Sequence, residues 1–319
     1  MESTLKSEWS KPRTILFATE VPCNEKAFSF ALAQAAAYGA QLILFHVFDT
    51  LVAGTSENAG ARYYDYSGSA QSEINHLQPL ASRAMAAGVP CEVVVRPGLA
   101  ADQILSYASE NPVDRIVMGT HSPGPIGKLL VGSVAEAVLR TAKVPVCVVG
   151  PNVPAVALEG PRIQTVLCAC SLKESTSVVS NFAAHVAMEH SSRLVLQHII
   201  QPQERTEVLA GHTIDDIEDE LLRLIPADIQ EKIDVQVVVV PGDPAEELLY
   251  QSRSQQADLI VLGAHGASAF AAITRHGIVY KVMAQAHCPV LTLSPAVLAQ
   301  GGSTGEQANS SEKFIAGVF

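Results

Sequence analysis

A long internal repeat constrains this sequence more than any other feature. The stretch Ile116–Val149 recurs as Ile260–Leu293 at a constant offset of 144 positions. Both copies carry a Gly-x-His sequence near their start and an Ala-x-x-Pro-Val sequence near their end. A repeat of this length is a whole domain, because solenoid units run about 20–50 residues. We therefore expect two tandem domains of one fold in the 319-residue chain.

Composition narrows the class of protein. The chain is 48% apolar and its formal net charge is −11, whereas a nucleic-acid binder needs a basic surface. No apolar run approaches the ~20 residues that span a bilayer, and residues 1–13 lack the apolar core of a secretory signal. We expect a cytoplasmic protein that binds neither nucleic acid nor membranes.

Strands and helices alternate in both halves. In the first half we expect strands at 13–20, 41–49, 91–96, 114–120 and 144–149, helices at 25–38, 69–87, 100–110 and 133–141, and a loop at 50–68. In the second half we expect strands at 164–170, 193–200, 234–240, 258–263 and 289–293, helices at 174–190 and 245–256, and an acidic amphipathic helix within 203–226. This order predicts an α/β fold in which each domain is an open five-stranded parallel sheet flanked by helices on both faces.

The domain boundaries follow from composition and from the repeat. We expect a flexible lead at 1–12, a first domain at 13–150, a proline-containing linker at 151–161, a second domain at 162–294 and a disordered Gly/Ser-rich tail at 295–319. The last strand of each half is a natural sheet edge, and an exposed apolar edge usually finds a partner. The two halves are expected to pair within one chain, and a homodimer of two chains is left open.

The six cysteines form no CxxC pair. Cys168 and Cys170 are two positions apart on a predicted strand, so they point to the same face. We interpret the cysteines as small buried apolar residues in a reducing compartment. We find no set of metal ligands with the spacing of a zinc site.

The loop after the fourth strand is a candidate anion site. Gly119 leaves the strand with little steric restriction, Gly132 lets backbone N–H groups approach an anion, and Ser133 can cap the next helix. Ligands of parallel α/β sheets bind beyond the carboxyl ends of the strands. This rule places Ala18–Glu20, Val47–Asp49 and Gly119–Ser122 on one rim.

These residues resemble the nucleotide signature of the universal stress proteins, which reads G-x-x-G, nine residues, then G-S or G-T. Gly119 begins the match and Gly132-Ser133 completes it, while Ser122 stands in the place of the second glycine. The resemblance covers about residues 12–150 and 162–294. It implies a stress-response protein that binds ATP or AMP, with magnesium as an accompanying ion.

The resemblance also implies roles for individual residues. Ala18 corresponds to the small residue beside the base, Glu20 to the acidic residue near the ribose, and Val47 to the backbone that meets adenine. The remaining implied contacts come from the strand end, the loop and the following helix, namely Met118, Gly119, His121, Ser122, Gly132, Ser133 and Val134.

The second copy departs from this signature. At the constant offset Gly132-Ser133 becomes His276-Gly277, and if Gly277 is instead the displaced glycine, Ile278 follows it. Ser171 replaces the carboxylate of Glu20. We therefore expect the second domain to be structural or regulatory.

Two functions from different classes fit the sequence. The first is a nucleotide-binding stress protein that uses its first domain and hydrolyses ATP slowly at most, because Glu20 is the single acidic candidate and no base or metal cage is identified. The second is a scaffold or regulatory protein that binds no nucleotide and acts through protein contacts; Ser122, the loop prolines and the altered second copy favour it. An enzyme acting on an adenylated substrate has little support.

Overall fold

The computed structural model describes residues 10–48, 66–120, 132–155, 163–171, 176–202, 213–263 and 277–302. The elements of the first half are β1 (Thr14–Thr19), α2 (Glu25–Tyr38), β2 (Gln41–Phe48), α3 (Tyr66–Ala86), β3 (Cys91–Pro97), α4 (Ala100–Glu110), β4 (Arg115–Gly119), α5 (Ser133–Thr141) and β5 (Val146–Val149). Those of the second half are β6 (Thr165–Cys170), α6 (Thr176–His190), β7 (Arg193–Ile200), α8 (Ile214–Arg223), α9 (Ala227–Gln230), β8 (Val235–Pro241), α10 (Pro244–Ser254), β9 (Leu259–Gly263), α12 (Ile278–Gln285), β10 (Val290–Leu293) and α13 (Pro295–Gly302).

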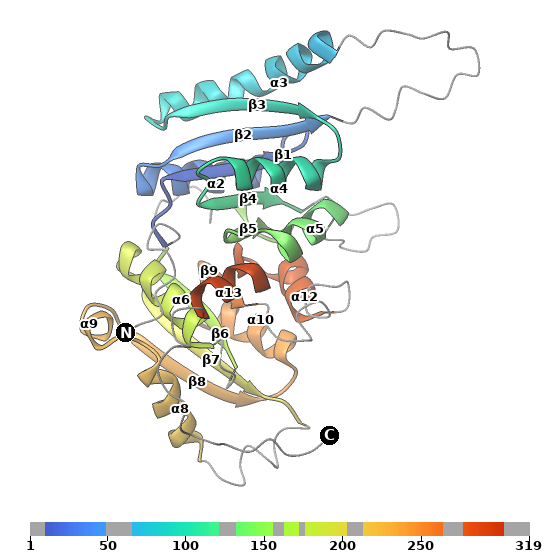
Figure 1. Cartoon of the computed structure of the whole chain (residues 1–319). Coiled ribbons are helices and arrows are strands. Elements are labelled where there is room, and N and C mark those ends of the chain that lie inside the picture. The colour runs from blue at the N-terminus through green and yellow to red at the C-terminus, as the bar shows by residue number, and fades with distance from the viewer. Residues whose placement is uncertain are drawn as a thin grey trace.

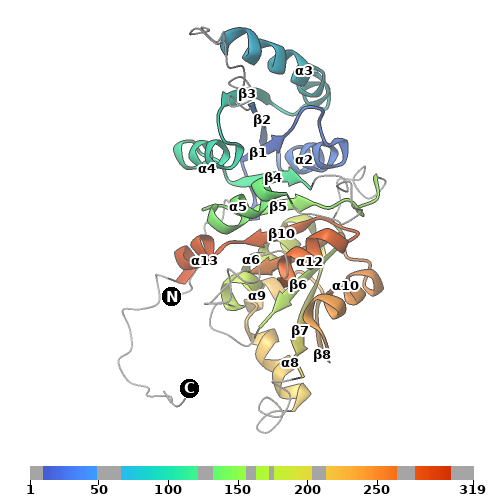
Figure 2. The ribbon, with the colours of Figure 1, turned by 90° about the vertical axis from the view of Figure 1, so that its right-hand side faces the viewer.

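The strands form one ten-stranded sheet with the order β3-β2-β1-β4-β5-β10-β9-β6-β7-β8. Within each half neighbouring strands are parallel, and the two halves meet where β5 pairs antiparallel with β10, with Cys147 opposite Leu291. Figure 1 shows the first half above the second, and Figure 2 labels β5 and β10 where the two halves meet. The expected α/β fold and the expected pairing of the two halves within one chain are both confirmed.

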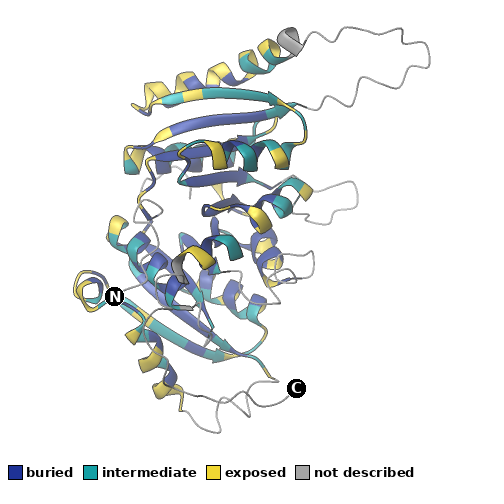
Figure 3. Cartoon of the chain, in the orientation of Figure 1, coloured by how far each residue is buried: buried dark blue, intermediate teal, exposed yellow. Residues whose placement is uncertain are grey.

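Helices cover both faces of this sheet, and Figure 2 shows them on either side of the strands. One apolar layer contains residues of α2, α3, α6, α8, α9 and α13, and the other contains residues of α4, α5, α10 and α12. Each layer continues from one half into the other. The central strands are buried on both faces, as Figure 3 shows, and this explains their nearly continuous apolar sequences.

Local signals explain where α2 begins and ends. The side chain of Asn24 accepts a hydrogen bond from the backbone N–H of Ala27 at 3.1 Å, so it caps the helix. Gly39 ends the helix in the left-handed conformation at φ 64°, which favours glycine.

The acidic helix expected within 203–226 is α8, where Ile217 and Leu221 are fully buried and the opposite face is exposed.

Two expectations are corrected at the ends of elements. Residues 66–68 begin α3 although we expected them in a loop, and residues 49–65 of that loop lie outside the described part of the chain. Residues 295–302 form α13 although we expected a disordered tail, of which 303–319 are not described. The physical reason is burial, because Val297 is fully buried and Leu298 is 6% exposed.

The contact between the halves is nearly symmetric. After β5, a Cβ atom on Gly150 would lie 2.4 Å from the carbonyl oxygen of Met283 in α12, so only glycine fits there. The side-chain amide of Asn152 donates to the carbonyl of Ala284 at 3.2 Å. After β10, Ser294 donates from its hydroxyl to the carbonyl of Ala142 at the end of α5. The segments that follow both last strands thus bind the helix of the opposite half.

Within the described ranges we find no helix that combines the length and the apolar character needed to cross a bilayer.

Candidate functional site

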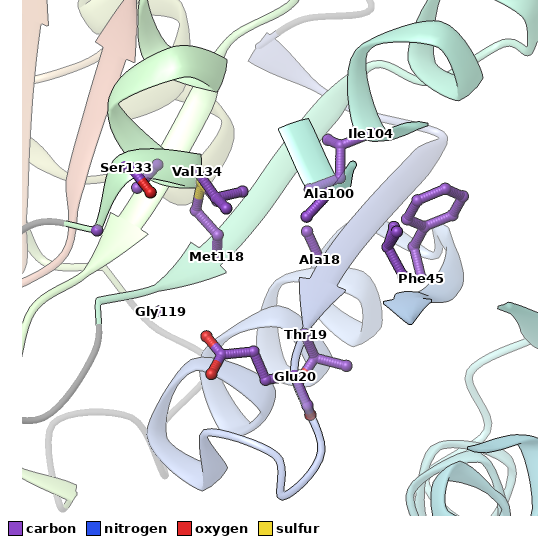
Figure 4. A pocket seen from close by; sticks show the side chains of 13 residues that line it. Ala18, Thr19, Glu20, Phe45, Ala100, Ile104, Met118, Gly119, Ser133 and Val134 are labelled. Atoms are coloured by element: carbon purple, nitrogen blue, oxygen red, sulfur yellow. The ribbon is translucent and has the colours of Figure 1, made fainter. Parts of the chain in front are cut away.

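A cavity of about 350 Å³ opens at the carboxyl ends of the strands in the first half. It lies between β1, β2, β4 and the beginnings of α4 and α5, as Figure 4 shows. Its lining consists of Ala18, Thr19, Glu20, Phe45, Val47, Ala100, Ile104, Met118, Gly119, Gly132, Ser133, Val134 and Ala135. The cavity sits where the strand order changes direction beside β1, which is the usual ligand position of such sheets.

Most residues that the sequence singled out come together in this cavity. Eight of the ten line it, namely Ala18, Glu20, Val47, Met118, Gly119, Gly132, Ser133 and Val134. The other two, His121 and Ser122, lie outside the described residues.

Sequence reasoning missed several lining residues that belong to neighbouring positions. These are Phe45, Ala100, Ile104 and Ala135. Thr19 also lines the cavity, and the sequence had placed it on the rim within Ala18–Glu20 without assigning it a contact. Phe45 could have been found, because side chains alternate along a strand and Phe45 shares a face with Val47. Ala100 and Ile104 could not, because only the tertiary fold brings the start of α4 over the sheet.

One end of the cavity is apolar and closely packed. Phe45 is 1% exposed, and its ring packs against Tyr107 with the centroids 4.9 Å apart. The guanidinium of Arg96 lies over the Tyr107 ring, 4.8 Å from its centre. Ile104 and Met118 complete the apolar wall. A flat apolar group can enter this end without leaving a polar atom unsatisfied.

The other end is polar and can hold an anion. Gly132 precedes α5 in an extended conformation, and no side chain of its own caps the helix. The first backbone N–H groups of a helix have no partner within the helix, and the helix dipole favours negative charge there. Ser133 is exposed at this helix start and offers its hydroxyl to the same point. Figure 4 shows the Glu20 carboxylate on the opposite side of the opening.

The structure gives a different reason for Gly119 from the one that we inferred. A Cβ atom at Gly119 would lie 2.4 Å from the side-chain nitrogen of Asn24. That amide donates to the carbonyl of Thr120 at 3.3 Å while its oxygen caps α2. Glycine is thus needed here to admit Asn24, which ties the end of β4 to the start of α2.

A histidine beneath the cavity fixes the end of β1. His46 donates from Nδ1 to the carbonyl of Thr19 at 2.9 Å, and its Nε2 faces the Glu73 carboxylate of α3 at 3.7 Å. The second half repeats this contact, because His198 Nδ1 lies 3.1 Å from the carbonyl oxygen of Cys170. Both rings hold the first strand of their half to the second.

Cys23 lines a groove that adjoins the cavity. Burial raises the pKa of its thiol, which keeps the thiol protonated and weakly nucleophilic. Across the described ranges, no group of three or more His, Cys, Asp or Glu side chains is arranged to hold a metal ion.

The second half presents a different surface at the corresponding place. Gly277 precedes α12 with nearly the same backbone angles as Gly132, so Gly277 is its structural counterpart despite the additional intervening residue. Ile278 then takes the place of Ser133 and is 39% exposed. Ser171 follows β6 where Glu20 follows β1. In strand register Gln197 corresponds to Phe45.

Comparison with known proteins identifies the family. A model described as the universal stress protein family matches residues 11–150 and again 162–294. The chain belongs to the universal stress protein family. A universal stress protein of Thermus aquaticus is 31% identical to it over 140 residues, which cover 43% of this chain and 98% of the relative.

A solved universal stress protein shares the fold of the whole described chain. A structure from Archaeoglobus fulgidus DSM 4304 covers 92% of this chain and 98% of its own, with a TM-score of 0.67 and 22% identity. Another universal stress protein, solved in complex with cAMP, covers 42% of this chain and 98% of its own, with a TM-score of 0.34 and 20% identity. The family model matches this chain twice, so each half of the ten-stranded sheet corresponds to one universal stress protein domain.

Proposed function

We propose that this universal stress protein binds an adenine nucleotide, ATP or AMP, in the cavity of its first half. One observation carries the proposal: a single cavity joins an apolar end, a carboxylate and an uncapped helix start. Those three features match the base, the ribose and the phosphate of a nucleotide in their chemistry and in their order.

The proposed orientation assigns each part of the ligand to a part of the cavity. The base lies against Phe45, Ile104 and Met118, and the backbone at Val47 meets its edge. Glu20 accepts a hydrogen bond from a ribose hydroxyl. The phosphates lie at Gly132 and Ser133, and magnesium enters with them, since this ion keeps waters and binds substrate phosphates.

Binding is the proposed activity, with slow ATP hydrolysis at most. Glu20 is the acidic side chain among the described lining residues, and it faces the ribose end. A general base must reach the attacking water beside the terminal phosphate. The proposed role of the second half is structural or regulatory, because Ile278 and Ser171 replace the hydroxyl and the carboxylate.

The alternative is a scaffold that binds no nucleotide. Its support is the partly exposed Ile278 at the helix start of the second half, where an apolar side chain suits a protein contact better than a phosphate. Such a protein would act through its surfaces, and its cavity would stay empty in the presence of nucleotide.

The test is calorimetric titration with ATP and magnesium after purified protein has been checked for carried-over nucleotide. We expect one site per chain. Gly132→Val should abolish binding, because a branched side chain fills the approach to the phosphates. Gly277→Val is the matched control, since both glycines precede a helix in the same conformation, and it should bind like the parent protein. No binding by nucleotide-free parent protein would support the scaffold instead.

We also propose a cytoplasmic location, because all six cysteines are free, as is usual in a reducing compartment. Cell fractionation tests the location. Light scattering tests whether two chains form a homodimer.

A further inference from the structure

A groove of about 490 Å³ adjoins the cavity of the first half. It shares Ala18, Thr19, Glu20 and Gly119 with that cavity. From there it continues to the first turn of α2, to Thr120 and to the segment that follows β5. A ligand that fills the cavity can therefore extend past Gly119 into the groove.

The groove contains a buried hydroxyl that no described group uses. Thr120 lines the groove directly after β4 and is 4% exposed. Its Oγ1 has no hydrogen-bond partner in the part of the chain that the structure describes. The backbone of Thr120 is fixed, because its N–H donates to the Val149 carbonyl at 3.1 Å and its carbonyl accepts from the Asn24 side chain at 3.3 Å. Since an unsatisfied buried hydroxyl costs free energy, a ligand atom that bonds to it is favoured here.

The start of α2 supplies further donors to the groove. Lys26 donates from Nζ to the carbonyl of Pro151 at 2.9 Å, and both residues line the groove. An ammonium group has three N–H donors, so two remain for a ligand. Asn24 caps the helix through the N–H of Ala27, whereas the N–H groups of Glu25 and Lys26 have no acceptor within the helix. The helix dipole adds positive potential at this end.

Two carboxylates also border the groove. Glu25 forms an ion pair with Arg83 at 2.8 Å, which offsets its charge. Glu20 lies on the part that the groove shares with the cavity, where the proposed orientation assigns it to the ribose. Magnesium that accompanies ATP reduces the repulsion between Glu20 and the phosphates. Beyond Glu20, the ammonium group of Lys26 is therefore the charge that favours an anion.

The fold itself does not require a lysine at this place. Helices α2 and α6 end in the same way, because Ala40 and Ser192 donate their N–H groups to the carbonyls of Ala35 and Ala187. This alignment places the buried Val178 where α2 has Lys26. The second half, in which the hydroxyl of Ser133 and the carboxylate of Glu20 are replaced, thus has no ammonium group at this position either.

We propose that the groove receives the terminal phosphates of ATP, so that the protein binds ATP in preference to AMP. This inference rests on the proposed function. The phosphate next to the ribose lies at Gly132 and Ser133, and the two phosphates beyond it continue past Gly119. The Thr120 hydroxyl, the Lys26 ammonium and the N–H groups at the start of α2 donate to their oxygens. AMP lacks the phosphates that reach the groove and forms none of these hydrogen bonds.

The experiment is calorimetric titration of the nucleotide-free full chain with ATP and, separately, with AMP, both in the presence of magnesium. We expect the parent protein to bind ATP more tightly than AMP. Lys26→Met should weaken ATP binding about tenfold, because a hydrogen bond between charged groups is lost, and should leave the affinity for AMP unchanged. Thr120→Val keeps the shape of the side chain without its hydroxyl and should also weaken the binding of ATP alone.

Unchanged AMP binding shows that each variant keeps a folded cavity. Lys143→Met removes an exposed ammonium group before β5, at the opposite end of the strands, and Thr292→Val removes a buried hydroxyl of β10 that also has no partner in the described segments. Both controls should bind ATP like the parent protein.

Two results would overturn this inference and leave the proposed function standing. One is equal affinity of the parent protein for ATP and AMP. The other is an equal effect of Lys26→Met and Thr120→Val on both nucleotides, or no effect on either. Binding of neither nucleotide by the parent protein would overturn the inference and the proposed function together.

Discussion

Glu20 contributes the carboxylate at the rim of the cavity, opposite the start of α5. We expect Glu20→Gln to weaken ATP binding about tenfold, because a hydrogen bond to a charged group contributes roughly 1.5–3 kcal/mol. Titration calorimetry measures the change. Ser171→Ala alters the corresponding position of the second half and should leave the affinity unchanged. Equal affinity of Glu20→Gln and the parent protein would remove Glu20 from the proposed site.

The buried side chain of Gln197 leads to a prediction about the stability of the protein. Its side chain is fully buried, and neither amide atom has a hydrogen-bond partner among the residues that the structure describes. An unsatisfied buried polar group costs about 1–3 kcal/mol. We therefore expect Gln197→Met, which is similar in size and apolar, to raise the free energy of unfolding by that order in urea titrations.

Gln34 provides the control for that prediction. It is also buried, but its Oε1 accepts a hydrogen bond from Arg115 at 3.0 Å. Gln34→Met should therefore destabilise the protein. Destabilisation by both substitutions would mean that the Gln197 amide is satisfied in solution.

Among the elements, α13 differs most from the sequence-based expectation. Its Gly/Ser-rich continuation suggested disorder from residue 295 onwards. The internal repeat nevertheless extends past the last strand, because Ser294-Pro295-Ala296-Val297 follows β10 as Gly150-Pro151-Asn152-Val153 follows β5. Both valines are fully buried. Composition averaged over the tail concealed this short ordered segment.

A buried α13 makes a direct prediction. We expect Val297→Ala to lower the free energy of unfolding by about 2 kcal/mol, since two buried methyl-sized groups and their packing are lost. Val153→Ala should cost a similar amount, and Ala299→Ser on the exposed face of α13 should cost almost nothing. Chemical denaturation measures all three. A neutral effect of Val297→Ala would mean that α13 does not pack on the sheet in solution.

The whole molecule is held together by more than the pairing of β5 with β10. Tyr38 at the end of α2 donates from its hydroxyl to His190 Nε2 at the end of α6, at 2.7 Å. Burial raises the pKa of Tyr38, so its hydroxyl keeps the proton that it donates. Burial, together with the charge of Arg115, lowers the pKa of His190 from 6.5 to about 4. The neutral imidazole therefore accepts this hydrogen bond between the halves.

This link predicts how stability depends on pH. The unfolded chain binds a proton at His190 below pH 6.5, but the folded protein does so only near pH 4. The contribution of neutral His190 to the free energy of unfolding is therefore complete above pH 6.5. It declines by roughly 1–3 kcal/mol as the pH falls from 6.5 to 4. His190→Gln does not titrate and should lose less stability over this interval in urea titrations. Equal losses in both proteins would assign the pH dependence to other groups.

The sequence by itself determined the class of fold and most of the described part of the cavity. Apolar strands, helix caps and the long repeat are local or periodic signals, and they fix the order of elements without knowledge of contacts. Because parallel strands present their carboxyl ends at one edge, residues as distant as Ala18 and Gly119 could be assigned to one rim before the structure was known. Phe45 was missed although its strand was recognised.

Only the tertiary structure decided the remaining features. The place of Ala100 and Ile104 above the sheet, the approach of Asn24 to Gly119 and the meeting of Tyr38 with His190 all join segments far apart in the chain. The same holds for the close contact of Gly150 with Met283. Such contacts depend on how elements pack in three dimensions, and no local propensity or periodicity encodes them. The sequence therefore predicts the helices and strands and the edge of the sheet at which the site lies, whereas packing decides which side chains contact one another.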